Sequence, residues 1–247
     1  MTIKTTLNYS PNFTSKKRTS NQIKFIIFHY TGMKKESEAI NRLTNIQSEV
    51  SCHYLIKNNG EIIKLVPDLY VAWHAGKSSW GSFKSLNQSS IGIEITNPGH
   101  EFSYKKFSNK QILSLLKLSK FLIKKYKISN KNILGHSDVA PERKKDPGEK
   151  FPWKYLSKNQ TGLWHTLKEH ELIKNRRFKI SKIEKIFFLN NIFKIGYSKK
   201  TKRVLDKNRY LRDITKTFQR RFRQELVNGE IDRECLIISE NLLKIYN

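Results

Sequence analysis

Three side chains able to bind a metal ion follow two of the predicted strands. His29 lies near the end of the apolar run IKFIIFHYT at 23–31, His136 ends the short run NILGH at 132–136, and Asp146 follows ten residues later. Strand ends at one edge of a sheet converge on a cleft. Two neutral imidazoles and one carboxylate form a common ligand set for a catalytic Zn²⁺, which keeps a fourth position for water. The pattern therefore indicates zinc, although a histidine at a strand end can equally be an ordinary surface residue.

A fourth candidate for chemistry, Glu94, lies on another predicted strand. The segment SIGIEIT at 90–96 alternates three isoleucines with other residues, so Glu94 faces away from the isoleucine side of the strand. Zinc lowers the pKa of a bound water to about 7. If Glu94 lies beside the metal, it is the candidate general base that takes the proton of this water.

The hydrophobic patterns predict the elements that position these residues. A helix is expected at 36–49 and a hairpin around Asn59-Gly60, because Asn-Gly tolerates the backbone of a tight turn. A second helix is expected at 108–127, where Ser108 and Gln111 have capping-box spacing. Strands alternating with helices predict an α/β fold, a mixed central β-sheet flanked by helices. Helical patterns at 209–222 and 235–246 predict a small all-α C-terminal domain.

Charge is the unusual feature of the composition. The chain of 247 residues has 48 Lys and Arg against 21 Asp and Glu, a net charge of +27. Such an excess favours an acidic partner such as nucleic acid, an anionic membrane surface or a carboxylate-rich polymer. Abundant Lys, Asn and Ile are also expected from an AT-rich genome, and the excess is spread along the chain rather than gathered in one tail. Both explanations stay open.

The cysteines and the N-terminal sequence indicate the cellular compartment of the protein. Cys52 and Cys235 are the two cysteines, far apart in sequence, so a disulfide framework is not indicated and a reducing compartment is favoured. No window reaches the length of a membrane span, and the N-terminus has no apolar core. Without a classical signal peptide the sequence predicts a cytoplasmic protein, and export by a non-classical route to the periplasm or outside stays open. The oligomeric state is not predicted.

Five blocks, taken in order, carry a family resemblance. They are FIIFHYT, VSCHYLI, LVPDLYVAWHAG, SIGIEITNPG and GHSDVAPERKKDPGEKFPW. Over about 20–157 the chain resembles the zinc-dependent N-acetylmuramoyl-L-alanine amidases of the type 2 amidase family, and most closely their AmiD-like branch. The resemblance implies the fold shared with peptidoglycan-recognition proteins. It also implies hydrolysis of the amide between the lactyl group of N-acetylmuramic acid and L-alanine, in peptidoglycan or muropeptides.

The resemblance also implies roles for residues. It makes His29, His136 and Asp146 the ligands of one Zn²⁺, Glu94 the catalytic acid and base, and Lys144 a stabiliser of the oxyanion. Contacts with sugar or stem peptide are expected from six further residues, His53, His74, Tyr30, Trp80, Asn97 and Arg143. His53 and His74 can equally be packed structural histidines.

The domain organisation expected from these patterns has four parts. They are a polar N-terminal extension at 1–20, a zinc amidase domain at 21–160, a linker at 161–177 and a helical domain at 178–247. The last resembles, more weakly, a three-helix peptidoglycan-binding domain. Its basic, Asn-rich run around 174–208 departs from that pattern, so a plain packing domain is an equal alternative.

Two other functions compete with hydrolysis. One is a module that binds muropeptide without cleaving it; the complete ligand set with Glu94 and Lys144 argues against this. The other is a nucleic-acid-binding protein, prompted by the charge of +27. The sequence has no helix-turn-helix, zinc finger or aromatic RNA-binding platform, so nucleic acid is not the expected partner.

Overall fold

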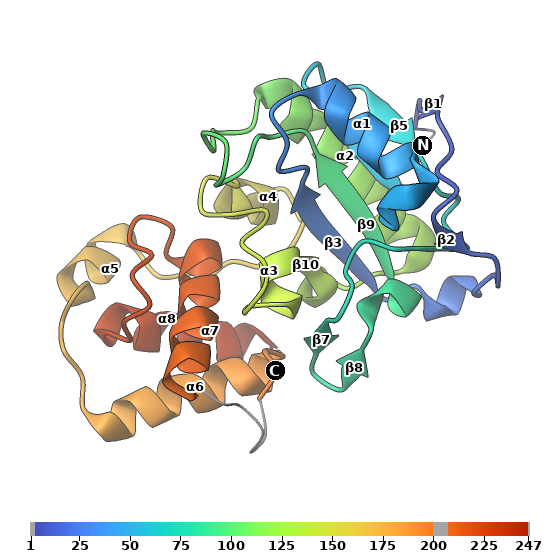
Figure 1. Ribbon diagram of the computed structural model, residues 1–247. Helices are drawn as coiled ribbons and strands as arrows, with labels where there is room; N and C mark the ends of the chain where they lie inside the picture. Colours follow the sequence, from blue (N-terminus) through green and yellow to red (C-terminus); the bar gives the residue numbers. More distant parts are fainter. Residues whose placement is uncertain (1–2, 200–206, 247) are drawn as a thin grey trace.

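A mixed six-stranded sheet forms the centre of the protein, whose computed structural model describes residues 3–199 and 207–246 (Figure 1). Residues 1–2, 200–206 and 247, which belong to the predicted N-terminal extension and helical domain, lie outside the described residues. The strands run in the order β1 (Thr6–Leu7), β5 (Ile62–Lys64), β4 (Tyr54–Ile56), β9 (Ser90–Ile95), β3 (Phe25–Tyr30) and β10 (Ile133–Gly135). The predicted mixed α/β sheet is confirmed.

The pairing of the strands sets which side chains are neighbours. Strands β4 and β5 form the predicted antiparallel hairpin, whereas β4, β9, β3 and β10 pair in parallel. Gly60 lies in the turn of this hairpin with φ of +86°, a backbone conformation that favours glycine. A Cβ atom at this position would also lie only 2.8 Å from the Lys110 carbonyl oxygen, so there is no room for a side chain. In the β3–β9 pair, His29 stands opposite Glu94. Both side chains therefore project from the same face of the sheet.

One face of the sheet is covered by helix α2 (Asn109–Tyr126). Ser108 caps this helix by accepting a hydrogen bond from the Gln111 amide, as its spacing predicts. Leu115, Leu118 and Leu122 of the helix pack with the isoleucines of β9 and with Phe28 in one buried cluster. Helix α4 (Trp153–Lys158) adds Trp153 and Leu156 to the same cluster.

The opposite face is covered in two parts. Helix α1 (Glu36–Thr44) packs Leu43 against Leu55 and Ile63 of β4 and β5. At the other end, Phe25 and Ile27 pack with three C-terminal helices, α6 (Lys182–Ile195), α7 (Lys207–Phe222) and α8 (Arg233–Tyr246). Figure 1 shows these helices gathered on the side of the sheet away from α1. The C-terminal helices thus share a hydrophobic core with the sheet.

The remaining short elements lie at the edges. They are β2 (Phe13–Thr14) paired with β6 (Val71–Ala72), the hairpin of β7 (Ser79–Trp80) and β8 (Phe83–Lys84), α3 (His136–Val139) and α5 (Glu169–Asn175). Strands β1 and β2 fall within the predicted 1–20 extension, and α5 falls within the predicted 161–177 linker. None of the helices in the described parts of the chain is long and apolar enough to cross a membrane.

A buried ion pair joins the C-terminal helices to the sheet. Arg221 of α7 donates to the Asp138 carboxylate at 2.5 Å and to the Ile133 carbonyl at 2.9 Å, and its guanidinium lies 4.3 Å from the Trp153 ring centre. Asp138 also accepts hydrogen bonds from the Tyr197 hydroxyl and the Gly135 amide. Because Asp138 belongs to α3, this network holds the short helix that begins at His136.

Replacing Arg221 with methionine is expected to destabilise the protein. The change leaves the Asp138 carboxylate buried without its positive partner, which costs about 3–5 kcal/mol of unfolding free energy. Urea unfolding followed by circular dichroism measures the loss. Arg212→Met on the same helix is the matched control, because Arg212 is exposed. Equal stability of the two variants would contradict a structural role for the ion pair.

Candidate active site

Three metal-binding side chains meet at one edge of the sheet. His29 comes from β3, His136 begins α3 directly after β10, and Asp146 lies in the following loop. The Nδ1 atoms of the two histidines are 2.9 Å apart, and each is 3.1 Å from Oδ2 of Asp146. All three residues are buried. The structure therefore brings together the three residues that the resemblance implies as ligands.

Hydrogen bonds on the far side of each imidazole fix where the ring protons lie. The Nε2 atom of His136 is 3.1 Å from the Ala75 carbonyl, which only accepts, so Nε2 carries a proton and, in the neutral ring that binds a metal, Nδ1 carries the lone pair. Ser90 donates its hydroxyl proton to the Leu86 carbonyl and so accepts from Nε2 of His74. Nδ1 of His74 then accepts from Nε2 of His29 at 3.0 Å.

With both rings neutral, the Nδ1 lone pairs of the two histidines face Oδ2 of Asp146 without a proton between them. Burial and the neighbouring His136 lower the pKa of His29 to about 4, so its ring is neutral at pH 7. Tetrahedral bonds of about 2.0–2.2 Å to zinc would place ligand atoms roughly 3.3–3.6 Å apart, a few tenths of an ångström wider than the observed separations. The donor set fits a metal ion.

Glu94 stands beside this cluster. Its side chain reaches the pocket, and its buried Oε2 has no hydrogen-bond partner among the described residues. Burial raises the pKa of Glu94 to about 8, the negative charge of Asp146 adds to this, and Lys144 opposes it. A carboxyl group with a pKa near neutrality can both take and return a proton, which suits general acid–base catalysis.

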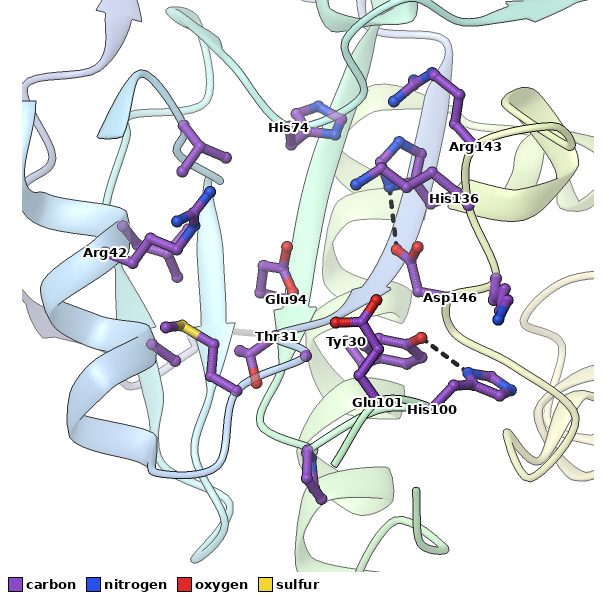
Figure 2. A pocket seen from close by; sticks show the side chains of 18 residues that line it. Tyr30, Thr31, Arg42, His74, Glu94, His100, Glu101, His136, Arg143 and Asp146 are labelled. Atoms are coloured by element: carbon purple, nitrogen blue, oxygen red, sulfur yellow. Dashed lines mark hydrogen bonds and ion pairs between the residues drawn. The ribbon is translucent and has the colours of Figure 1, made fainter. Parts of the chain in front are cut away.

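A pocket of about 440 Å³ opens over these groups. Figure 2 shows His74, Glu94, His136 and Asp146 around it, with Arg42 of α1 across from them. Lys144 and Arg143 line it, as does Tyr30, whose hydroxyl lies 2.8 Å from Nδ1 of His100. Four charged or polar residues that line the pocket were not predicted from the sequence: Arg42, His100, Glu101 and Lys145. A pocket of this size with a few convergent charges is typical of a small-molecule or peptide site.

Three residues expected at the substrate lie outside the lining of this pocket. Trp80 is buried with its ring centre 4.8 Å from that of Tyr197. Asn97 is buried and donates to the Lys105 carbonyl. His53 is buried behind the site, where Nδ1 accepts from the Gly92 amide and Nε2 lies 2.9 Å from the Arg18 guanidinium. By contrast Tyr30, His74 and Arg143 line the pocket.

His53 is expected to make stability depend on pH. Burial, helped by Arg18, lowers the pKa of His53 to about 3. Below pH 6.5 the unfolded chain therefore binds a proton that the folded protein does not, and stability falls as pH falls from about 6.5 toward 3. One such group contributes up to about 1.4 kcal/mol per pH unit.

Urea unfolding of the chelator-treated protein at pH 7 and pH 5 tests this dependence. His53→Gln is expected to show a shallower decrease than the wild type, whereas the exposed His170→Gln is expected to match the wild type. A slope unchanged by His53→Gln would show that other groups bind the proton.

The sequence of this chain is similar to those of known enzymes. The mixed sheet, the three-residue cluster able to hold a metal and the adjacent carboxyl form a site of the kind found in metal-dependent hydrolases. Residues 19–149 match the family model described as N-acetylmuramoyl-L-alanine amidase. The chain is also 35% identical over 237 residues to N-acetylmuramoyl-L-alanine amidase AmiD of Escherichia coli, covering 91% of this chain and 84% of that protein. The chain belongs to the N-acetylmuramoyl-L-alanine amidases of this type 2 family.

Other relatives and solved structures agree in fold. An AmpD amidase of Haemophilus influenzae is 40% identical over 113 residues, which cover 45% of this chain and 59% of that protein. The structure of Escherichia coli AmiD with an anhydro-N-acetylmuramic acid tripeptide superposes with a TM-score of 0.79 at 34% identity, covering 91% and 90% of the two chains. AmpDh3 of Pseudomonas aeruginosa gives 0.78 at 29% identity, covering 100% and 99%. The similarity to AmiD and AmpDh3 thus includes the C-terminal helices.

Proposed function

We propose that this amidase holds one Zn²⁺ with His29, His136 and Asp146 and cleaves the lactyl–L-alanine amide of muropeptides that contain an anhydro-sugar. The convergence of three lone pairs within about 3 Å carries the metal assignment. Two solved relatives that resemble this chain over most of its length have been described with anhydromuramyl peptides. These complexes support the same substrate class here.

The residues around the cluster divide the chemistry between them. Zinc, when bound, supplies a Lewis acid that polarises the scissile carbonyl and acidifies water. Glu94 takes the proton of the attacking water on its carboxylate and returns it to the alanine nitrogen as the amide breaks. Lys144, which lines the same pocket, places a positive charge where the carbonyl oxygen becomes negative.

The walls of the pocket provide groups that orient the substrate. Arg42 of α1 and Lys145 of the loop before Asp146 both line the pocket with positive charge, and Arg42 lies across it from Asp146 (Figure 2). A stem peptide carries free carboxylates, which arginine can bind with two parallel hydrogen bonds. Tyr30 and His100 offer rings beside the cluster against which a sugar can pack.

Release of stem peptide from a purified anhydromuropeptide tests the proposal. Mass spectrometry of products follows zinc-loaded protein, chelator-treated protein and treated protein with zinc restored. Cleavage at the lactyl–alanine bond in the first and third samples is expected, with loss in the second. Intact sacculi run in parallel distinguish a preference for soluble fragments from action on the wall. Zinc-loaded protein that cleaves neither substrate would contradict the proposal.

A further inference from the structure

Helix α6 is apolar on two faces although the described residues cover only one. Phe188, Ile192 and Ile195 are buried against α8 and the rest of the C-terminal core. On the opposite side Ile183, Ile186 and Phe187 are 64%, 54% and 53% exposed. These positions are spaced i, i+3 and i+4, so they form one stripe along the helix. A surface helix usually has one apolar stripe, which faces the core, so this second stripe has no cover among the described residues.

The loop before the helix extends this apolar surface. Phe178 is 64% exposed, and its carbonyl accepts a hydrogen bond from the Arg233 amide. Arg233 also forms an ion pair with Glu184 on α6, which fixes the loop close to the start of the helix. We call Phe178, Ile183, Ile186 and Phe187 the α6 patch. Figure 1 shows α6 at the outer edge of the molecule, on the far side of the C-terminal helices from α1.

The segment of the chain that carries the α6 patch is strongly basic. Between residues 172 and 199 the sequence contains one acid, Glu184, and that acid is paired with Arg233. The exposed cations in the same segment are Lys174, Arg177, Lys179, Lys182, Lys185, Lys194 and Lys199. A surface of large apolar side chains bordered by lysines is complementary to a layer whose outside is negative and whose inside is apolar.

The charge also argues against other occupants. A second copy of this chain would bring the same cations against the patch, and like charges oppose such contact. Peptidoglycan could pair with the lysines and stack a sugar on Phe178 or Phe187, but its hydroxyl- and carboxylate-rich chains would leave the exposed Ile183 and Ile186 without an apolar partner. We propose that the α6 patch is a membrane-binding surface that inserts its apolar side chains among the headgroups of anionic phospholipids.

Sedimentation with lipid vesicles tests this surface on the full chain. Vesicles of phosphatidylcholine with and without phosphatidylglycerol are compared at low and high salt. Wild-type protein is expected to bind the anionic vesicles and to be released by salt. The double variant Ile186→Ser with Phe187→Ser is expected to bind at least about tenfold more weakly, because burial of two large apolar side chains is lost. Lys182→Gln is expected to weaken binding about fivefold.

The matched control is Leu113→Ser, because Leu113 is 52% exposed on α2, away from the patch. It is expected to bind vesicles as the wild type does. All variants should keep the wild-type unfolding temperature and amidase turnover. Equal vesicle binding by the double variant and the wild type would overturn the proposal. So would a wild-type dimer in sedimentation velocity that only the patch variant dissolves, or a loss of binding to sacculi without loss of binding to vesicles.

Discussion

Replacing Glu94 with glutamine is expected to lower amidase turnover by about 10²–10⁴-fold, the contribution of a positioned general base. Glutamine has nearly the same shape, and the buried Oε2 that it replaces has no partner among the described residues, so the fold should persist. An amide cannot take the proton of the attacking water. Steady-state cleavage of anhydromuropeptide measures kcat, and zinc content measured on the same samples shows that the metal is retained.

The matched control for this variant is Glu101→Gln. Glu101 lines the same pocket and is exposed, so its substitution removes one negative charge near the substrate without touching the cluster. Its turnover is expected to remain within a few-fold of the wild type. A Glu94→Gln enzyme with nearly full turnover would mean that another group accepts the proton.

Removing the Asp146 carboxylate is expected to abolish tight metal binding. The change Asp146→Ala deletes one of three converging donor atoms and the only negative charge among them. Removing a residue that only hydrogen-bonds to a metal ligand typically lowers metal affinity by about 10–100-fold. Removing a ligand itself should therefore lower the affinity for zinc by more. Titration calorimetry of zinc into chelator-treated protein measures this directly.

Thermal unfolding gives a second readout for the same variant. Zinc at 1,000 times its Kd stabilises a protein by about 4 kcal/mol, so the wild type should unfold at a higher temperature with zinc than without it. Asp146→Ala should lose that shift, whereas Glu142→Ala, an exposed acid of the same loop, should keep it. Zinc binding unchanged in Asp146→Ala would place the metal elsewhere.

Local patterns in the sequence were sufficient for much of the fold. The alternation in SIGIEIT predicted both the strand and the side on which Glu94 lies, because the period of a strand fixes side-chain direction. Asn59-Gly60 predicted the β4–β5 hairpin, and Ser108 with Gln111 predicted the start of α2. These features depend on neighbours in sequence. The convergence of His29 and His136 also followed from strand ends, since β3 and β10 are parallel neighbours.

Features that depend on long-range packing were beyond the sequence. Arg42 reaches the pocket because α1 lies over β4 and β5, and no motif marks it. The burial of His53 is completed by Arg18, which comes from a segment expected to be a polar extension. The link between Arg221 and Asp138 joins residues far apart in the chain, so neither residue alone indicated it. In each case the deciding partner is brought by the tertiary fold.

The shared core between the sheet and the C-terminal helices has a consequence for synthesis of the chain. Phe25 and Ile27 of β3 precede by far, in the order of synthesis, Phe218 of α7 and Leu236 and Ile238 of α8, which pack in the same cluster. At ribosomal rates of about 5–20 residues per second, the strands emerge several seconds before their cover does. Until these helices have emerged, this face of the sheet is an apolar surface open to chaperones and to aggregation, so the nascent chain can complete this core only once α7 and α8 are available.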